Sequence, residues 1–271
     1  MINRILYKLF YRIHDLALRP HILSAIGKLN SEPQPEAHKL AACLTETFSS
    51  ILTPEESDAV QLLESIRTRL ECSNERILMT DYGTQAKNSG EQIARVVGDV
   101  AVQSSKPYRW ALFLFKLIRT FKPASCLELG TCLGVSGMYQ ASALRLNGKG
   151  SLVTLEGAES YAAIAKETFS SAGFPDIQIV VGRFQETLFV AAAQIAPIDL
   201  VFIDGHHDGD ATLRYFETLL PFCSAAAIVV FDDIHWSRGM TRAWNVLRTD
   251  SRVAFFSDLS QVGIIFLRPK R

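Results

Sequence analysis

Short, mostly apolar runs alternate with longer amphipathic stretches from residue 125 to the end of the chain. The apolar runs predict strands at 126–129, 152–155, 177–181, 200–203 and 228–231. The stretches between them predict helices near 135–146, 161–172, 185–195 and 211–221. Because parallel strands need long crossover connections, this alternation predicts a parallel sheet with helices on both faces.

Two more apolar runs, 253–256 and 263–267, follow a last predicted helix near 240–248. Only a short connection separates these two runs, which favours an antiparallel pair. The predicted fold class is α/β: a doubly wound seven-stranded, mostly parallel sheet whose last strand is antiparallel, with a helical N-terminal extension.

The pattern divides the chain into two predicted parts. Residues 1–120 are predicted to form a helical extension or lid, and residues 121–271 to form the sheet domain. Thr53-Pro-Glu-Glu predicts a helix start, with Thr53 as the N-cap and proline at the first helical position. A polar segment, 81–90, predicts a loop before helices at 93–102 and 108–120, and its residues Asp81, Tyr82 and Gly83 are candidate lid contacts.

The first twenty residues predict an amphipathic helix, with charges spread among the apolar positions. This pattern, which has no small-residue cleavage site, predicts neither a signal peptide nor a membrane span. The helix is expected to pack on the domain or on a second subunit, which leaves a homodimer through the N-terminal helices open. An interfacial membrane helix is the other interpretation.

The charge balance narrows the classes of partner. Lys plus Arg and Asp plus Glu number 28 each, so bulk charge gives no argument for nucleic acid or acidic lipid. The chain is 48% hydrophobic and 21% charged, and can therefore bury a substantial core. Its five cysteines are odd in number and include no CxxC pair, which indicates reduced thiols and a cytoplasmic location.

The segment Ser125–Ser136, SCLELGTCLGVS, is the strongest functional signal in the chain. Gly130 and Gly134 bracket a turn in which a Cβ would crowd a bound ligand, and Glu128 lies near the end of the preceding strand. An acid beside such a turn suits a cofactor recognised through hydroxyls and an amine. The glycine spacing is not the GxGxxG of a pyrophosphate cradle, although glycines can also serve close packing alone.

Ligands of open α/β sheets bind outside the carboxyl ends of the strands. Glu156 ends the second strand and is placed for a ribose diol, as it would be in a dinucleotide fold too. Asp204 ends the fourth strand, and Asp232 and Asp233 end the fifth. Neighbouring strands lie about 4.8 Å apart, so these three carboxylates are expected to converge, which would either raise the pKa of at least one of them or recruit a cation such as Mg²⁺. The alternative is that Asp233 caps the next helix and Asp204 binds backbone in its loop.

Three of the six histidines, His206, His207 and His235, follow the fourth and fifth predicted strands. Their place at the mouth of the crevice predicts a general base, with His207 and His235 as the candidates. Trp236 is expected either to line the acceptor pocket or to anchor its loop.

Four segments, taken together, resemble the class I S-adenosylmethionine-dependent methyltransferases, in their O-methyltransferase-like branch. These segments are LELGTCLGVS (127–136), LVTLEG (152–157), IDLVFIDGHH (198–207) and VVFDDIHWSRGMTRAW (229–244). The resemblance implies S-adenosylmethionine as cofactor and a small-molecule methyl acceptor.

The resemblance also implies roles for single residues. The implied cofactor-binding residues are Glu128, Gly130, Thr131, Gly134, Ser136, Glu156, Gly157, Gly182, Phe184 and Asp204. The implied ligands of Mg²⁺ or another hard divalent cation are Asp204, Asp232 and Asp233. The candidate catalytic residues are His207, His235 and Asp204, and the two histidines are candidates because they lie at the mouth of the crevice.

Two positions depart from the family pattern. Gly182-Arg183 stands where the family often has Gly-Asp, so adenine recognition falls to Phe184 or to backbone. The usual lysine after the strand-four aspartate is missing, and His207 occupies that neighbourhood.

The leading hypothesis is therefore methyl transfer from S-adenosylmethionine to a hydroxyl, assisted by a divalent ion that lowers the hydroxyl pKa. A non-catalytic S-adenosylmethionine-binding sensor or subunit is the main alternative, and an NAD-dependent oxidoreductase is a second. A nucleic-acid methyltransferase is disfavoured, because the chain shows no basic patch with interleaved aromatic residues.

Overall fold

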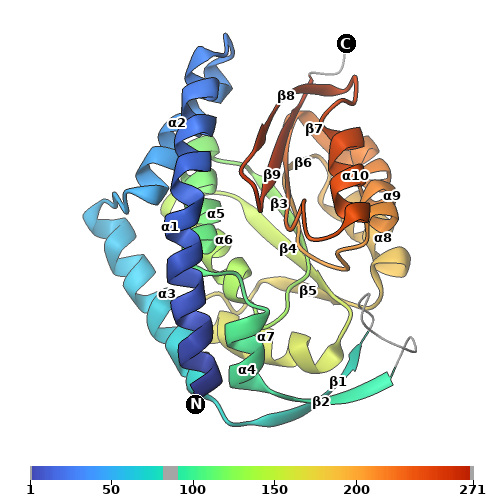
Figure 1. Cartoon of the computed structure of the whole chain (residues 1–271). Coiled ribbons are helices and arrows are strands. Elements are labelled where there is room, and N and C mark those ends of the chain that lie inside the picture. The colour runs from blue at the N-terminus through green and yellow to red at the C-terminus, as the bar shows by residue number, and fades with distance from the viewer. Residues whose placement is uncertain (1, 82–90, 269–271) are drawn as a thin grey trace.

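The computed structural model describes residues 2–81 and 91–268, and a seven-stranded sheet lies at the centre of this part of the chain (Figure 1). The strand order is β5-β4-β3-β6-β7-β9-β8, and all neighbours are parallel except that β9 is antiparallel to β7 and β8. The strands are β3 (Ser125–Leu129), β4 (Ser151–Glu156), β5 (Gln178–Val181), β6 (Ile198–Ile203), β7 (Cys223–Phe231), β8 (Val253–Asp258) and β9 (Gly263–Leu267). The predicted fold class is confirmed, including the antiparallel last strand.

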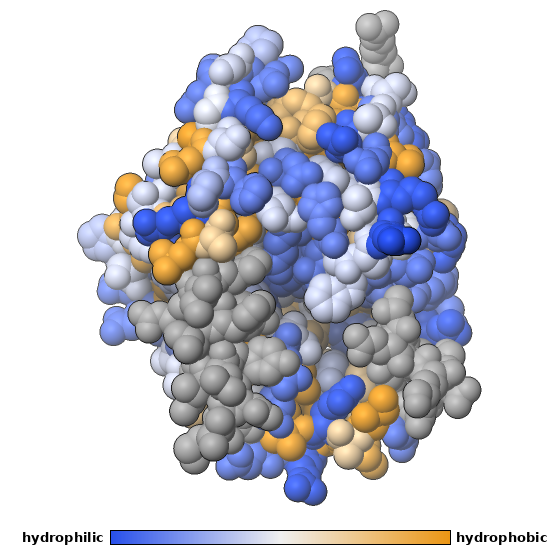
Figure 2. Space-filling model, viewed as in Figure 1, coloured by the Kyte–Doolittle hydropathy of each residue, from blue (hydrophilic) through white to orange (hydrophobic). Residues whose placement is uncertain are grey.

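Helices cover both faces of the sheet, as predicted (Figure 1). One face carries α5 (Tyr108–Phe121), α6 (Val135–Leu146) and α7 (Glu159–Ser171). The other carries α8 (Phe184–Ile195), α9 (Gly209–Leu219) and α10 (Arg238–Leu247), with the 3₁₀ turn η1 (Leu220–Phe222) after α9. Because side chains alternate along a strand, Cys126 packs into the first core and Leu127 into the second. Mostly hydrophilic residues cover the outer side over α9 and α10 (Figure 2).

The N-terminal helices form an outer layer on the first face, where α1 packs on α2 and α2 packs on α5 (Figure 1). They are α1 (Ile2–Ser31), α2 (Pro35–Phe48), α3 (Pro54–Cys72) and the short α4 (Val97–Gln103). The predicted start of α3 is confirmed: Thr53 Oγ1 accepts from the Glu56 N–H, and the Glu56 carboxylate accepts from the Thr53 N–H. No helix among the described residues is both long and apolar enough to cross a membrane. The homodimer and the division at residue 120 stay predictions.

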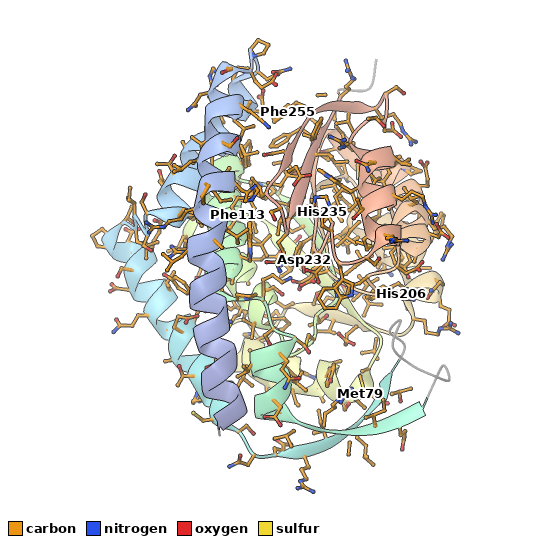
Figure 3. The ribbon with its side chains drawn as sticks, in the orientation of Figure 1. Met79, Phe113, His206, Asp232, His235 and Phe255 are labelled. Atoms are coloured by element: carbon orange, nitrogen blue, oxygen red, sulfur yellow. The ribbon has the colours of Figure 1, made fainter. Side chains whose placement is uncertain are left out.

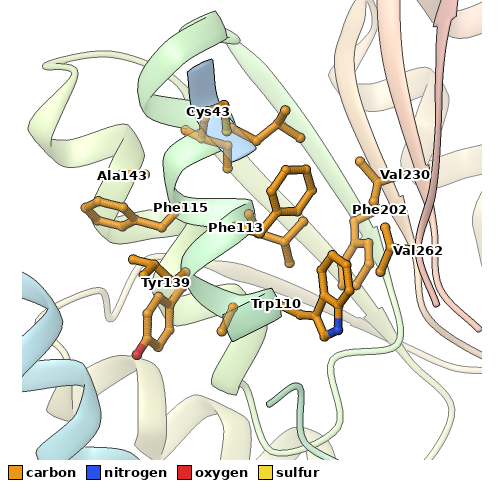
Figure 4. Packing of buried hydrophobic residues seen from close by; sticks show 14 of the residues in the cluster. Cys43, Trp110, Phe113, Phe115, Tyr139, Ala143, Phe202, Val230 and Val262 are labelled. Atoms are coloured by element: carbon orange, nitrogen blue, oxygen red, sulfur yellow. The ribbon is translucent and has the colours of Figure 1, made fainter. Parts of the chain in front are cut away.

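Helix α5 fixes the outer layer to the sheet (Figure 4). Trp110 and Phe113 are almost fully buried and meet edge to face, with ring centroids 5.9 Å apart. They pack between Cys43 of α2 and Phe202 of β6, in one cluster that runs from α1 to β9. Each buried aromatic side chain of this size contributes about 2–3 kcal/mol. The loop before α5 is therefore held by a rigid support.

A β-hairpin replaces part of the helix predicted at 93–102. Strand β1 (Arg76–Asp81) pairs antiparallel with β2 (Glu91–Val96), and α4 begins only at Val97. The prediction was wrong over 93–96, because Ile93 and Val96 lie in a strand whose partners are Met79 and Arg76 of β1. Strand pairing across an intervening loop also carries no local signal. The candidate lid contacts Tyr82 and Gly83 lie outside the described residues.

Candidate active site

A cavity of about 510 Å³ opens at the carboxyl ends of β3, β4 and β6. Met79 of β1 and the loop between α4 and α5 close its other side; Figure 3 shows Met79 on the hairpin below His206. The predicted site residues that line this cavity are Gly130, Thr131, Ser136, Glu156, Gly157, Phe184, Asp204 and His207. Both halves of the predicted site therefore share one space.

The two glycines of the β3–α6 turn are required by the protein's own packing. Gly130 has φ +103°, and a Cβ there would lie 2.2 Å from the carbonyl oxygen of Asp204. A Cβ on Gly134, at φ +82°, would lie 3.0 Å from Cε1 of Phe169 and 3.2 Å from Cα of Ala165. The prediction that these Cβ atoms would crowd a ligand is therefore corrected, because a side chain would strike backbone or α7 first. Gly130 nonetheless lines the cavity, whereas Gly134 does not.

Glu156 is fixed at the edge of the cavity by backbone donors. The N–H of Cys132 donates to Oε2 at 2.7 Å, and the N–H of Ala158 donates to Oε1 at 2.8 Å. Burial raises the pKa of Glu156, and these backbone hydrogen bonds oppose that shift. Each carboxylate oxygen keeps a further lone pair. The geometry is that of an acceptor pre-oriented for hydroxyl groups.

Glu128 lies deeper than predicted and is outside the cavity lining. It is fully buried, and accepts from Gln140 Nε2 and from Thr154 Oγ1, both at 2.8 Å. Burial raises its pKa to about 7, although these two hydrogen bonds and one from Ser136 act to lower it. A cofactor role for Glu128 stays a prediction, and its contacts here are with the β4 and α6 side chains behind the turn.

The strand-end carboxylates converge as predicted, but they meet a lysine that the sequence did not point to. Lys106, in the loop between α4 and α5, places Nζ 3.2 Å from Oδ1 and 3.1 Å from Oδ2 of Asp204. The same ammonium forms a short ion pair with Oδ2 of Asp232. Lys106 is 6% exposed and Asp232 3%. Figure 3 shows Asp232 in the middle of the molecule. Asp204 and Asp232 are therefore paired with a cation that the protein itself supplies.

The pKa shifts of Asp204, Asp232 and Asp233 follow from burial, from the Lys106 ammonium and from the neighbouring charged groups. Burial, together with the neighbouring acids Asp232 and Asp233, raises the pKa of Asp204 despite Lys106. Burial acts to raise the pKa of Asp232 too, but the Lys106 charge, the hydrogen bonds with Asp204 and Lys106, and His207 together hold that pKa below its ordinary value. Burial and the Asp232 charge raise the pKa of Asp233.

These contacts do not fit the divalent cation predicted at Asp204, Asp232 and Asp233. The ammonium occupies both oxygens of Asp204 and one of Asp232, and a hard divalent ion needs about six oxygen ligands. No group of three or more His, Cys, Asp or Glu side chains within residues 2–81 and 91–268 is arranged to hold a metal. Asp233 does not cap the next helix either, because Ser237 accepts from the Met240 N–H there.

The structure separates the two candidate bases. His207 lines the cavity, and its Nδ1 lies 3.6 Å from Oδ2 of Asp233. His235 lies outside the lining, with Nε2 3.2 Å from Asp258, so it ties its loop to β8. Trp236 is 64% exposed and outside the lining, which argues against a pocket wall.

Several lining residues had no usable sequence signal. The hairpin supplies Met79 and Thr80, and the α4–α5 loop supplies Ser104, Ser105 and Lys106. The letters SSKP mark a loop before a helix, but nothing in them places that loop beside β6 and β7. These residues enter the site only through the packing of α5.

Part of the chain is similar to known methyltransferases. Residues 127–234 match the family model described as a methyltransferase domain. A catechol O-methyltransferase of Niastella koreensis is 32% identical over 124 residues, which is 45% of this chain and 54% of that protein. A putative O-methyltransferase of Mycobacterium sp. is 35% identical over 109 residues, or 40% of this chain and 47% of that protein. The chain spans about half the length of the curated relatives it matches.

Solved structures share the fold. The O-methyltransferase from Bacillus cereus in complex with SAH aligns with a TM-score of 0.54 at 20% identity. The alignment covers 82% of this chain and 94% of that one. At such low identity the likeness shows the fold, and it confirms the predicted architecture.

Proposed function

We propose that this chain, whose residues 127–234 match the family model of a methyltransferase domain, transfers a methyl group from S-adenosylmethionine to a hydroxyl oxygen of a small molecule. The observation that carries the proposal is the single cavity. It joins Glu156 and the Gly130–Thr131 turn, suited to the donor, with Asp204 and His207, suited to an acceptor. The O-methyltransferases among the relatives support oxygen as the receiving atom.

The donor half presents rigid groups of the right chemistry. The Glu156 carboxylate is held for the ribose hydroxyls. Phe184 lines the cavity and packs edge to face on Tyr215, with ring centroids 5.7 Å apart, so its ring has a fixed place for the adenine. Ser136 lines the cavity at the N-terminal turn of α6.

The acceptor half must align a hydroxyl and remove its proton. When bound, S-adenosylmethionine supplies a methyl group that its sulfonium charge has already activated. Alignment of the acceptor oxygen by the cavity supplies much of the rate. Oδ2 of Asp233 faces Nδ1 of the His207 ring at 3.6 Å, and we assign Nε2 of His207 as the atom that takes the hydroxyl proton.

Titration calorimetry with S-adenosylmethionine tests the donor half. The Glu156→Gln variant keeps the shape and loses the charge. We expect it to bind at least about tenfold more weakly, because hydrogen bonds to charged groups contribute about 1.5–3 kcal/mol. Glu159→Gln, the same change on an exposed residue of α7, is the matched control and should bind as the wild type does. Equal affinity in all three proteins would overturn the donor assignment.

A screen of phenols, catechols and other hydroxylated small molecules tests the acceptor half. Mass spectrometry should find an added methyl group together with the demethylated cofactor. Tight cofactor binding without any methylated product would instead support the non-catalytic sensor. Binding of NAD in place of S-adenosylmethionine would support the oxidoreductase.

A further inference from the structure

Lys106 is built into the acidic end of the sheet. Its Nζ lies within 3.2 Å of both Asp204 oxygens and pairs with Asp232, at the point where β6 and β7 end. The side chain is 6% exposed and lines the cavity beside Ser105. An ammonium group has three N–H donors. Among the described residues its hydrogen bonds go to Oδ1 of Asp204 and Oδ2 of Asp232, so two acceptors face three donors.

The backbone that carries Lys106 is fixed on both sides. Its carbonyl oxygen accepts from Nη1 of Arg67 at 2.6 Å, which ties the loop to α3. The next residue, Pro107, is the N-cap of α5, and Trp110 one turn later is buried in the main core. Nζ also lies 5.8 Å from the centroid of the Phe202 ring on β6. The lysine is therefore held in place by the fold.

A divalent ion and this ammonium compete for the same oxygens. A metal ion at the cluster would find three of the six carboxylate oxygens paired with Lys106. Asp233 is engaged as well, since Oδ1 accepts from Gln261 Nε2 at 3.3 Å and Oδ2 faces His207. Oδ1 of Asp232 is buried and has no hydrogen-bond partner in the described structure. A divalent ion there, even one that keeps several waters, would lie beside the Lys106 ammonium that pairs with Oδ2 of the same carboxylate, and the two cations would repel each other.

We propose that Lys106 is the resident cation of this site, and that its ammonium, in place of a divalent metal, orients the acceptor oxygen. The inference rests on the proposed function. In the transfer, the sulfur–methyl bond breaks, an oxygen–methyl bond forms, and the hydroxyl proton passes to His207. The free N–H of Lys106 stabilises the charge that develops on the oxygen while its proton leaves. Asp204 and Asp232 position the ammonium.

Electron paramagnetic resonance of Mn²⁺ tests the cation without any assay of activity. The wild-type protein is expected to leave Mn²⁺ free in solution at millimolar concentration. Stoichiometric Mn²⁺ binding that disappears in the Asp204→Asn variant would overturn the proposal. This result stands whether or not S-adenosylmethionine binds, so it separates failure of this inference from failure of the proposed function.

Kinetics with an acceptor found in the screen supply the second test. Wild-type turnover should not change after EDTA treatment, and loss of turnover that Mg²⁺ restores would overturn the proposal. We expect Lys106→Met to lower kcat by about 10²-fold or more, the typical cost of losing one charge-stabilising donor. Cofactor affinity should stay within about threefold of wild type by calorimetry.

Two further variants serve as controls for Lys106→Met. Lys106→Arg keeps the charge and should retain more turnover than Lys106→Met. Lys149→Met, on an exposed lysine after α6, should leave turnover unchanged. Full turnover in Lys106→Met would refute the role. If Lys106→Met does not fold, the wild-type Mn²⁺ and EDTA measurements still decide.

Discussion

Replacing Gly130 by alanine should damage both the stability of the fold and the site. Gly130 connects β3 to the turn that lines the cavity, and its N–H donates to the carbonyl of Leu155 at 2.9 Å. An added Cβ would lie 2.2 Å from the Asp204 carbonyl oxygen and 2.9 Å from its carbonyl carbon. The methyl group therefore meets the backbone of the residue whose side chain holds Lys106.

The magnitude follows from two terms. Alanine at φ +103° costs about 1–3 kcal/mol in backbone strain. Overpacking against backbone adds about 1–3 kcal/mol, because no flexible side chain can move aside. The sum is about 4 kcal/mol. Relief of the contact also requires a shift of the Asp204 carbonyl by about 1 Å, and a misplacement of that size costs about 10²-fold in rate.

Gly148 offers a matched control in the same chain. It has φ +69° and nothing within 4 Å of its ideal Cβ, so alanine there meets only the left-handed backbone. We expect Gly148→Ala to cost about 1 kcal/mol and to leave turnover unchanged. Urea unfolding gives both free energies, and the m-values check that the denatured states are comparable.

The difference between the two variants is the decisive quantity. Gly130→Ala should be less stable than Gly148→Ala by about 3 kcal/mol. Equal losses of unfolding free energy in the two variants would refute the reasoning, because they would mean that the Asp204 carbonyl does not exclude a Cβ at Gly130. Normal turnover in a destabilised Gly130→Ala would refute only the link from the turn to Asp204.

Three further outcomes are expected. His207→Asn should lower kcat by about 10²-fold or more with unchanged cofactor affinity, whereas His235→Asn should keep turnover, as steady-state kinetics and calorimetry will show. Burial raises the pKa of Glu128 from 4.5 to about 7, so the folded state holds more protons than the unfolded state in this range and stability falls as pH rises through it. Glu128→Gln should remove that fall, at most about 3 kcal/mol, in urea melts at roughly pH 4.5 and pH 7. Lys116 donates to Glu56 at 2.6 Å and is 3% exposed, so Lys116→Met should lower the unfolding free energy by about 3–5 kcal/mol and leave cofactor affinity unchanged.

Local periodicity was enough to predict the sheet and its ligand-facing edge. Strands such as β4 and β9 show short apolar runs and are buried on both faces, as expected for strands that helices cover on either side. Because parallel strands all end at one edge, the acids that follow β6 and β7 had to meet. The positions of Asp204 and Asp232 were therefore predictable without any knowledge of their contacts.

The pairing of those acids was not predictable in the same way. Lys106 precedes Asp204 by 98 residues and Asp232 by 126. Its loop has no periodicity, and its location depends on how α5 packs under β6. The hairpin of β1 and β2 was not predicted for a related reason, because each of these short strands is stabilised by pairing with the other. Long-range packing determines both the position of Lys106 and the pairing of β1 with β2. A local sequence pattern carries no information about such packing.

Some of the site residues lie inside the segment that matches the family model, and the others lie before it. Residues 127–234 contain Glu156, the turn at Gly130 and the strand-end acids, but the match begins after Lys106. The residues suited to the donor, Glu156 and the turn at Gly130, therefore lie in the segment that matches the family model, whereas Lys106 and the hairpin precede that segment. Lys106 lies directly before Pro107, the N-cap of α5, and Trp110 is buried within the first turn of that helix, so the packing of the outer layer and the position of the Lys106 ammonium are coupled. Under the proposed function, acceptor choice is expected to vary with the described residues 76–81 and 91–107 rather than with the glycine turn.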